Sequence, residues 1–436
     1  MATSKSGRGV GADISREYCL MHIVFIESNT TGTGYLLASQ ARKQGFEVLV
    51  LARDVTKYQF ASDIAVESFD TNNLSLLWQR LTQLQDTSSS SMVSNSSVAA
   101  VMSTSEYFIE TAATLAKKLN LPGVNPDAVK LCRDKYRMRQ TLQDKVNFPV
   151  PCRLLTSDQD IPGAVAELNF PMVIKPRSGS GSCAVALCHS VEDIHRALAD
   201  NREFLRKTGR ELNEVGCLAE FFVTGQEYSV ECFHGRAVSL TRKHLGAAPY
   251  FVEIGHDINF GISSVLKEHI LAQVQEMLTA VGLTWGPAHV EIKVSESQLQ
   301  LIEINPRLAG GMIPVLIEQT LGVNLLGAWL TAALGDEPDL TPWKKEQGAI
   351  RFLVPQHGQS IAKLLDDAVL KDCAQRAALP LKTITDIKLY KPVGFQSLTQ
   401  GDFSDRIGHL IAVAPQLEFD QVDAFQSQVL NEVMCD

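Results

Sequence analysis

The alternation of apolar and polar positions divides the chain into parts of different architecture. Residues 21–27 (MHIVFIE) and 47–52 (EVLVLA) are short apolar runs separated by a turn and a helical pattern. Such runs are typical of buried parallel strands, and strand, helix and strand within about thirty residues form a right-handed βαβ unit. With a further strand at 98–102 and a helix at 106–119, the pattern predicts an open parallel α/β domain over residues 21–127.

Two segments of this part carry no periodic pattern. Residues 1–20 lack the apolar core of a signal peptide, and we expect a disordered leader or a remnant added for expression, with Met21 as the candidate original start. Residues 87–97 are rich in serine, which predicts a flexible surface loop.

The turn after the first strand raises the alternative of a dinucleotide site. Gly32 and Gly34 match two positions of the GxGxxG pattern, but its third glycine is missing. Because a match of this length has a high false-positive rate, NAD binding is the weaker interpretation.

The middle of the chain mixes β-hairpins with helices. Residues 171–176 (PMVIKP) form a strand that contains Lys175, and the loop 177–182 (RSGSGS) leads to another strand at 184–187. A loop of small residues can place backbone N–H groups against phosphate oxygens, while the lysine supplies a point charge. The alternative is a flexible hairpin with an exposed lysine. The loop is not a Walker loop, because GxxxxGK[ST] is absent.

Two further segments are ambiguous by themselves. Lys135 lies in a helical stretch at 131–142, where a lysine is usually solvent-exposed. Residues 217–223 (CLAEFFV) form a strand that crosses to another at 227–233 (EYSVECF). Such a crossover could present backbone groups to an adenine edge and a carboxylate to ribose hydroxyls, or it could be an ordinary surface hairpin.

The most informative pattern is a hairpin at 289–294 (HVEIKV) and 299–307 (LQLIEINPR). Both arms alternate with a period of two, so Glu303 and Asn305 share one face and Glu291 lies opposite them. Two carboxylates and an amide oxygen on one surface suit Mg²⁺, which takes its other ligands from water and phosphates. The alternative is a polar stripe on a solvent-facing edge hairpin.

The pattern changes again near residue 342. Strands at 348–354, 384–390 and 409–415 predict a small C-terminal α+β domain over residues 341–436. The expected organisation is therefore mixed α/β and α+β, with the chemistry in residues 128–340.

Composition narrows the function classes. The net charge of the 436-residue chain is -9, which disfavours nucleic acid and anionic membranes as partners. Its nine cysteines form no CxxC pair or zinc-type spacing, and no apolar run reaches the ~18 residues of a membrane span. We expect a cytoplasmic protein with reduced cysteines.

The ordered motifs Lys135, VIKPRSGSGS, AEFFVTGQEYSV, HVEIKV and LIEINPRLAGG resemble those of the ATP-grasp superfamily. The resemblance covers roughly residues 21–355. GHD at 255–257 and NPRLAGGMIP are most similar to the L-amino acid ligases, the dipeptide synthetases of the bacilysin and dapdiamide type. The resemblance implies an ATP-grasp fold over residues 128–340, with a small ATP-lid subdomain at about 150–223.

The same resemblance implies an ATP site. The two lysines would hold phosphates, the small-residue loop would close over them, and the crossover would face adenine and ribose. The implied residues are Lys135, Lys175, Ser178, Gly179, Ser180, Gly181, Ser182, Glu220, Phe221, Phe222, Val223 and Glu227.

It also implies a metal and substrate site. Two Mg²⁺ ions, with Mn²⁺ able to substitute, would bind Glu291, Glu303 and Asn305. Arg307 would be catalytic by stabilising the transferring phosphoryl group. Apart from the resemblance, His256 is a candidate catalytic residue because a histidine with an ordinary pKa near ~6.5 could accept the proton of the amine; the alternative is a structural histidine. The substrate set is Glu253, His256, Arg307, Gly310 and Gly311; the proline usual after the GHD stretch is absent, which leaves the substrates open.

The expected activity is an ADP-forming carboxylate–amine ligase. ATP would convert a carboxylate to an acyl-phosphate, and the amine of a second small molecule, most simply another amino acid, would displace phosphate. A homodimer is compatible with this expectation. The alternatives are a bicarbonate-using carboxylase or purine-pathway ligase with the same ATP motifs, and a regulatory ATP-binding protein without turnover.

Overall fold

The computed structural model describes residues 21–29, 32–86, 97–146, 148, 150–179, 181, 183–207, 209–246, 252–295, 299–398 and 403–435. The expected leader, all but the last residue of the serine-rich loop, and Ser180 and Ser182 lie outside these described residues. The chain divides into two units, Met1–Gly123 with Leu330–Asp336 and Val124–Trp329 with Glu337–Asp436.

The first unit contains a four-stranded parallel sheet in the order β3-β2-β1-β4. The strands are β1 (Met21–Ile26), β2 (Glu47–Ala52), β3 (Ala65–Ser68) and β4 (Ser97–Met102), and the helices are α1 (Thr33–Lys43), α2 (Leu74–Asp86) and α3 (Ile109–Lys118). The apolar runs at both central strands are buried, because helices cover a parallel sheet. The predicted open parallel α/β sheet is confirmed.

Packing explains the glycine at the end of the turn after β1. A Cβ on Gly34 would lie 2.4 Å from Ser28 Oγ and 2.6 Å from Thr104 Oγ1. These two hydroxyls hydrogen-bond each other at 2.9 Å, which ties the ends of β1 and β4 together. Gly34 is therefore required by the close approach of two strand ends.

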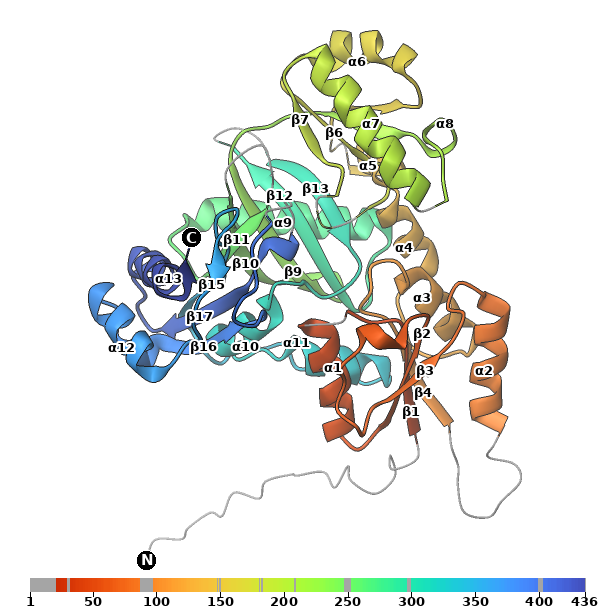
Figure 1. The fold of residues 1–436 in the computed structure, drawn as a ribbon. Helices are drawn as coiled ribbons and strands as arrows, with labels where there is room; N and C mark the ends of the chain where they lie inside the picture. Colours follow the sequence, from red (N-terminus) through yellow and green to blue (C-terminus); the bar gives the residue numbers. More distant parts are fainter. Residues whose placement is uncertain are drawn as a thin grey trace, which may run out of the picture. The chain divides into compact units, whose positions relative to one another are not determined.

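A smaller sheet of the second unit has four antiparallel strands in the order β5-β8-β6-β7. Its strands are β5 (Cys152–Leu155), β6 (Met172–Pro176), β7 (Ala186–Cys188) and β8 (Cys217–Phe221), with helices α6 (Ile161–Leu168), α7 (Val191–Lys207) and α8 (Leu212–Val215). Its core joins apolar residues of the strands to α6 and α7, which lie beside the sheet in Figure 1.

The large sheet of the second unit has eight strands, all antiparallel, in the order β13-β12-β9-β10-β11-β14-β17-β16. They are β9 (Gln226–Phe233), β10 (Arg236–Leu245), β11 (Glu253–Ile258), β12 (Pro287–Val294), β13 (Leu299–Asn305), β14 (Gln347–Leu353), β16 (Ile384–Leu389) and β17 (Gly408–Ala414). The three strands predicted for a C-terminal domain therefore extend the sheet that carries the predicted hairpin (Figure 1).

Strand alternation gives this sheet an apolar and a polar face. Val230, Val290 and Ile292 pack on the apolar face against Ile270 and Val274 of α9. The residues between them in sequence point to the opposite face, which carries the charged side chains. The core thus fixes which residues meet on the polar face.

The remaining elements are mostly helices of the second unit. They are α4 (Pro126–Arg133), α5 (Lys135–Val146), α9 (Ser264–Val281), α10 (Ile313–Leu321), α11 (Leu325–Ala333), β15 (Ser360–Ile361), α12 (Asp367–Arg376), α13 (Phe419–Val433) and β18 (Met434–Cys435), with 3-10 turns at Val55–Lys57, Asp158–Asp160, Leu381–Thr383 and Phe403–Asp405. Within the described ranges no single helix has the length and apolarity of a membrane span; the bent pair α10 and α11 reaches them only together, with a 104° bend.

One predicted helix is interrupted. The stretch at 131–142 is two helices, because α4 ends at Arg133 and α5 starts at Lys135. The break at Asp134 lets its carboxylate bind the Arg177 guanidinium, with Arg177 Nε 2.8 Å from Oδ1 and Nη2 2.6 Å from Oδ2. Periodicity alone could not reveal a break made by a distant arginine.

Candidate active site

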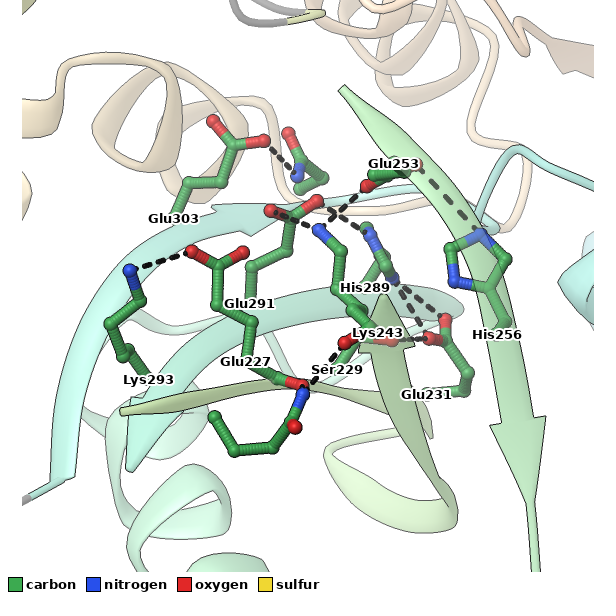
Figure 2. A network of polar contacts seen from close by, with 12 residues as sticks. Glu227, Ser229, Glu231, Lys243, Glu253, His256, His289, Glu291, Lys293 and Glu303 are labelled. Atoms are coloured by element: carbon green, nitrogen blue, oxygen red, sulfur yellow. Dashed lines mark hydrogen bonds and ion pairs between the residues drawn. The ribbon is translucent and has the colours of Figure 1, made fainter. Parts of the chain in front are cut away.

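The polar face of the large sheet gathers charged side chains that are shielded from solvent (Figure 2). Three pairs face each other across β9 and β12: Glu227 and Lys293, Ser229 and Glu291, and Glu231 and His289. A charged side chain that is shielded from solvent is stable only when it is paired with an opposite charge or hydrogen-bonded. The contacts among these residues therefore define the site.

The hairpin of β12 and β13 brings together the predicted metal ligands. Glu291 lies directly opposite Glu303 in the register, as predicted. Asn305 Nδ2 donates a hydrogen bond to Glu303 Oε1 at 2.9 Å. The described residues contain no group of three or more His, Cys, Asp or Glu side chains arranged to hold a metal ion. The set is two carboxylates and one amide.

Both carboxylates are held in the anionic state. Burial by itself raises the pKa of Glu291, but the Lys243 ammonium and His289 outweigh it and lower that pKa to about 2. Burial opposes ionisation of Glu303 too, and the Lys135 charge lowers its pKa below the usual value. Anionic hard oxygens beside an amide oxygen suit a divalent cation such as Mg²⁺ that brings water and phosphate ligands of its own.

Lys135 links this carboxylate pair to the small-residue loop. Its Nζ lies 3.1 Å from Glu303 Oε2 and donates a hydrogen bond to the carbonyl of Gly179 at 3.0 Å. Its backbone N–H donates to the carbonyl of Arg177, at the start of the loop. The lysine is buried rather than solvent-exposed, and it places a positive charge between the loop and the carboxylates of Glu291 and Glu303.

Lys175 adds a second cation from β6. Its Nζ lies 2.5 Å from Glu220 Oε2, and Arg139 Nε lies 2.5 Å from the other oxygen of the same carboxylate. Burial lowers the pKa of Lys175 to about 8, although Glu220 acts in the opposite direction. Two cations share one carboxylate here, which leaves positive charge for an anion such as a phosphate.

The crossover between β8 and β9 is not a hairpin, because the two strands belong to different sheets. Gly225 has a φ of 143°, and a Cβ there would lie 2.2 Å from the carbonyl oxygen of Val294. Beyond it, Glu227 Oε1 lies 3.0 Å from Lys293 Nζ, and that ammonium sits 4.8 Å from the ring centre of Phe222. The crossover is thereby held against β12.

His289 connects the predicted ligand Glu291 to a buried partner. Its Nε2 lies 2.9 Å from Glu291 Oε1, while its Nδ1 lies 2.9 and 3.0 Å from the two oxygens of Glu231. Ser229 Oγ in turn donates to Glu231 at 2.8 Å. Burial disfavours the imidazolium, but the Glu231 charge and the two carboxylate hydrogen bonds raise the pKa of His289 to about 10. Both ring nitrogens are therefore donors that hold Glu291 in place.

The strand β11 extends this network. Lys243 Nζ bridges Glu253 Oε1 at 2.6 Å and Glu291 Oε2 at 2.8 Å. Arg406 donates through Nη2 to Glu253 Oε2 at 3.1 Å and through Nε to the Glu253 carbonyl at 3.2 Å. Although burial raises it, the pKa of Glu253 falls well below the usual value because Lys243, His256 and Arg406 stabilise the carboxylate.

His256 lies at the end of the network and is fully buried. Neither ring nitrogen has a hydrogen-bond partner among the described residues, and Nε2 is 3.8 Å from Glu253 Oε2. Burial lowers the pKa of His256 to about 3, despite the opposing effect of Glu253. The imidazole is thus neutral near pH 7, so one ring nitrogen can donate a hydrogen bond and the other can accept one. The role of His256 as a proton acceptor stays a prediction, and the same two ring nitrogens could also bind a polar group of a substrate.

Comparison with known proteins identifies the family. The ATP-grasp domain model matches residues 168–315. An uncharacterised protein of Sinorhizobium fredii, y4rH, is 30% identical over 402 residues, which cover 90% of this chain and 78% of that protein. The chain belongs to the ATP-grasp family.

Other ATP-grasp proteins are more distant. Human carnosine synthase 1 is 26% identical over 63% of this chain, which spans only 36% of that protein. The structure of an L-amino acid ligase from Bacillus licheniformis superimposes with a TM-score of 0.73 at 19% identity, covering 95% of this chain and 97% of that one. The predicted ATP-grasp fold, family and likeness to L-amino acid ligases are confirmed.

The ATP-grasp motifs occupy distinct positions around the site. Ser178 Oγ accepts a hydrogen bond from Arg210 Nη1 at 3.3 Å, and Gly181 adopts a positive φ of 67°. The Phe221 side chain is 37% exposed, whereas Val223 is buried. Glu220 forms ion pairs with Lys175 and Arg139. In this structure its carboxylate therefore contacts cations, whereas the resemblance implied that it faces adenine.

Arg307 and the two glycines follow β13. Arg307 Nη1 donates to the carbonyl of Leu308 at 3.0 Å. Gly311 has a φ of 58°, and a Cβ there would lie 3.0 Å from His256 Nε2. Among the described residues, nothing lies within 4 Å of a Cβ on Gly310. Of the two glycines, Gly311 is the one that lets the backbone approach His256 closely.

Sequence reasoning did not single out four charged residues of the network. Glu231 and His289 alternate with Glu227 and Glu291 on the same strands, so the period-two pattern could have revealed them. Lys243 lies on β10 and Arg406 in the segment before β17. Only the tertiary fold brings these two residues to the site, and no local pattern marks them.

Proposed function

We propose that this chain is an ATP-dependent carboxylate–amine ligase that joins two amino acids, or an amino acid and a related acid. The observation that carries the proposal is the pairing of Glu291 with Glu303 on one largely buried face, beside Lys135. Carboxylates alone would repel ATP. Carboxylates that hold a divalent cation, with lysines beside them, are instead suited to bind the phosphates of ATP.

The first step is phosphorylation of the substrate carboxylate. Its oxygen attacks the γ-phosphorus of ATP, a P–O bond to ADP breaks, and an acyl-phosphate forms. Lys135 and Lys175 balance phosphate charge, and Arg307 stabilises the transferring group. Glu291, Glu303 and Asn305 would hold Mg²⁺, which offsets negative charge on the phosphates when bound.

The second step is attack of a neutral amine on the acyl carbon. The C–N bond forms, the C–O bond to phosphate breaks, and the proton that the amine loses is taken up by the departing phosphate. Glu253, His256 and Gly311 line the proposed substrate side of the site. Free thiols among the described cysteines agree with a cytoplasmic reaction, where ATP is available.

The test is a phosphate-release screen of the twenty amino acids, singly and in pairs, with ATP and Mg²⁺. We expect release that depends on a pair, together with a ligated product detected by mass spectrometry. Release that requires bicarbonate, or an aminoimidazole or phosphoribosylamine acceptor, would instead identify the alternative ATP-grasp activities. ATP binding without any release would identify a regulatory protein.

The nucleotide product tests the acyl-phosphate route directly. Transfer of the terminal phosphoryl group predicts ADP and phosphate in equal amounts with the ligated product. Anion-exchange chromatography of the quenched reaction measures both nucleotides. Stoichiometric AMP and pyrophosphate would reject this route.

A further inference from the structure

The C-terminal strands bring an arginine to the substrate side of the polar face. His256 on β11 lies opposite Ile350 on β14, so Phe352, two residues further on, shares the same face. The His256 and Phe352 rings meet edge to face at 5.6 Å. Arg406, which precedes β17, lays its guanidinium 3.9 Å from the ring centre of Phe352. The face thus continues from the ATP-grasp motifs into the C-terminal part.

The Arg406 guanidinium is held in one orientation. Its Cζ lies over the Phe352 ring, and its Nε and Nη2 both donate to Glu253. Its hydrogen bonds within the described ranges use Nε and Nη2 and not Nη1. The side chain is 13% exposed. A guanidinium fixed along one edge keeps its other edge for a planar acceptor such as a carboxylate, which it can bind through two parallel hydrogen bonds.

The charge balance around Glu253 shows what such an acceptor would do. In the free protein, Lys243 and Arg406 balance Glu253 and Glu291. A substrate ammonium that binds Glu253 adds one positive charge at this buried corner. A second substrate group with a negative charge restores the balance, because unpaired charge is costly at this depth. The carboxylate being phosphorylated cannot serve, since it must face ATP.

We propose that Arg406 binds a substrate carboxylate that is not activated, and that it selects substrates carrying one. This rests on the proposed ligase function and specifies its substrate class. The carboxylate has two sources: the α-carboxylate of the amine substrate, or the side-chain carboxylate of a dicarboxylic acid substrate. Arg406 is thus a specificity-determining residue contributed by the C-terminal part.

The experiment compares binding of matched acid and neutral ligands by isothermal titration calorimetry in the presence of Mg²⁺ and ADP, which prevents turnover. One arm pairs each of the twenty amino acids with its α-amide. The other pairs aspartate with asparagine and glutamate with glutamine. The proteins are wild type, Arg406→Gln, Arg406→Lys and the control Arg376→Gln. Arg376 is a surface arginine of α12 that pairs with Glu432.

We expect wild type and Arg376→Gln to bind at least one acid about tenfold more tightly than its neutral partner. Arg406→Gln should lose about tenfold in affinity for that acid and change less than about twofold for the neutral partner. Arg406→Lys, which keeps the charge without the fork, should recover part of the preference. The arm that responds identifies the source of the carboxylate.

The inference is overturned if wild type prefers no acid over its neutral partner, or if the preference survives in Arg406→Gln. It is also overturned if both members of a pair lose affinity equally, which is the result of structural damage. Melting curves of all four proteins accompany the titrations. Failure of the ligase function gives a different result: acids bind selectively through Arg406, but no pair releases phosphate from ATP.

Discussion

Glu303 occupies a position where a single side chain serves two partners. Its carboxylate accepts a hydrogen bond from Asn305 Nδ2 and forms an ion pair with Lys135 Nζ. The residue lies opposite Glu291 in the strand register. Replacing it with glutamine preserves shape and removes the charge. We expect Glu303→Gln to lower the ligation rate about 100-fold or more at limiting Mg²⁺, because one anionic ligand becomes neutral.

The control for this variant is Glu268→Gln, an exposed glutamate of α9. Initial rates across a Mg²⁺ titration, with circular dichroism spectra of each protein, separate loss of metal from loss of fold. Wild-type rates in Glu303→Gln at limiting Mg²⁺ would remove this residue from the metal site.

Lys175 predicts how nucleotide affinity changes with pH. Its pKa is lowered to about 8, mainly by burial. The ammonium therefore carries its charge below that pH and loses it above. ADP should bind about tenfold more weakly near pH 9.5 than near pH 7, because a neutral amine does not attract phosphate.

The Lys175→Arg variant is the matched test. Arginine stays charged throughout this range, so the variant should show a nearly flat dependence of ADP affinity on pH. Fluorescence titration with a labelled ADP measures both proteins at each pH. An identical loss of affinity in the two proteins would assign the effect to another group.

At the scale of the element, the β8–β9 crossover depends on one glycine. The Cβ of Gly225→Ala would collide with the Val294 carbonyl, and the φ of 143° is unfavourable for alanine. We expect a loss of about 2–4 kcal/mol in the free energy of unfolding, and weaker ADP binding because the crossover moves away from β12. Urea denaturation and ADP titration measure these two effects.

Gly209→Ala is the control for the backbone angle. Gly209 has a φ of 73°, also in the positive range, but no described atom lies within 4 Å of the place that a Cβ would take there. The free energy of unfolding of Gly209→Ala should therefore fall by only about 1 kcal/mol, the cost of placing alanine at a positive φ. Equal losses in the two variants would show that the close approach to Val294 is unimportant.

At the scale of the whole molecule, the C-terminal strands belong to the sheet that carries the site. β11 pairs with β14, and Arg351 on β14 places Nη1 2.7 Å from Oδ1 of the fully buried Asp257. A chain ending at residue 340 would expose the β11 edge and remove this cation. We expect that chain to be insoluble or to lack a cooperative unfolding transition.

A chain ending at Val433 is the matched truncation, because it loses only the two-residue strand β18 and the terminal residue. It should unfold cooperatively, close to the full chain, in a scanning calorimeter. A soluble, cooperatively folding chain of residues 1–340 would instead support the domain boundary that the sequence predicts near that position.

The sequence by itself determined the elements whose signals are local. The apolar runs placed β1 and β2, and alternation in two nearby arms placed the β12–β13 hairpin with Glu291 opposite Glu303. Alternation with a period of two sets the face of every side chain, and a short connection limits the register. The ATP-grasp motifs were recognisable for the same reason, since each lies within a few consecutive residues.

Only the tertiary structure decided which charges neutralise one another. Lys243 and Glu253 meet because β10 and β11 pair in one sheet, and Arg406 joins them from the segment before β17. Arg406 lies far from both in sequence, so no local pattern shows the contact. The state of His256 was decided in the same way. A histidine ordinarily titrates near pH 6.5, but complete burial without a hydrogen-bond partner among the described residues makes its charged form unfavourable. Burial is a property of the packed molecule, so no local pattern could supply it.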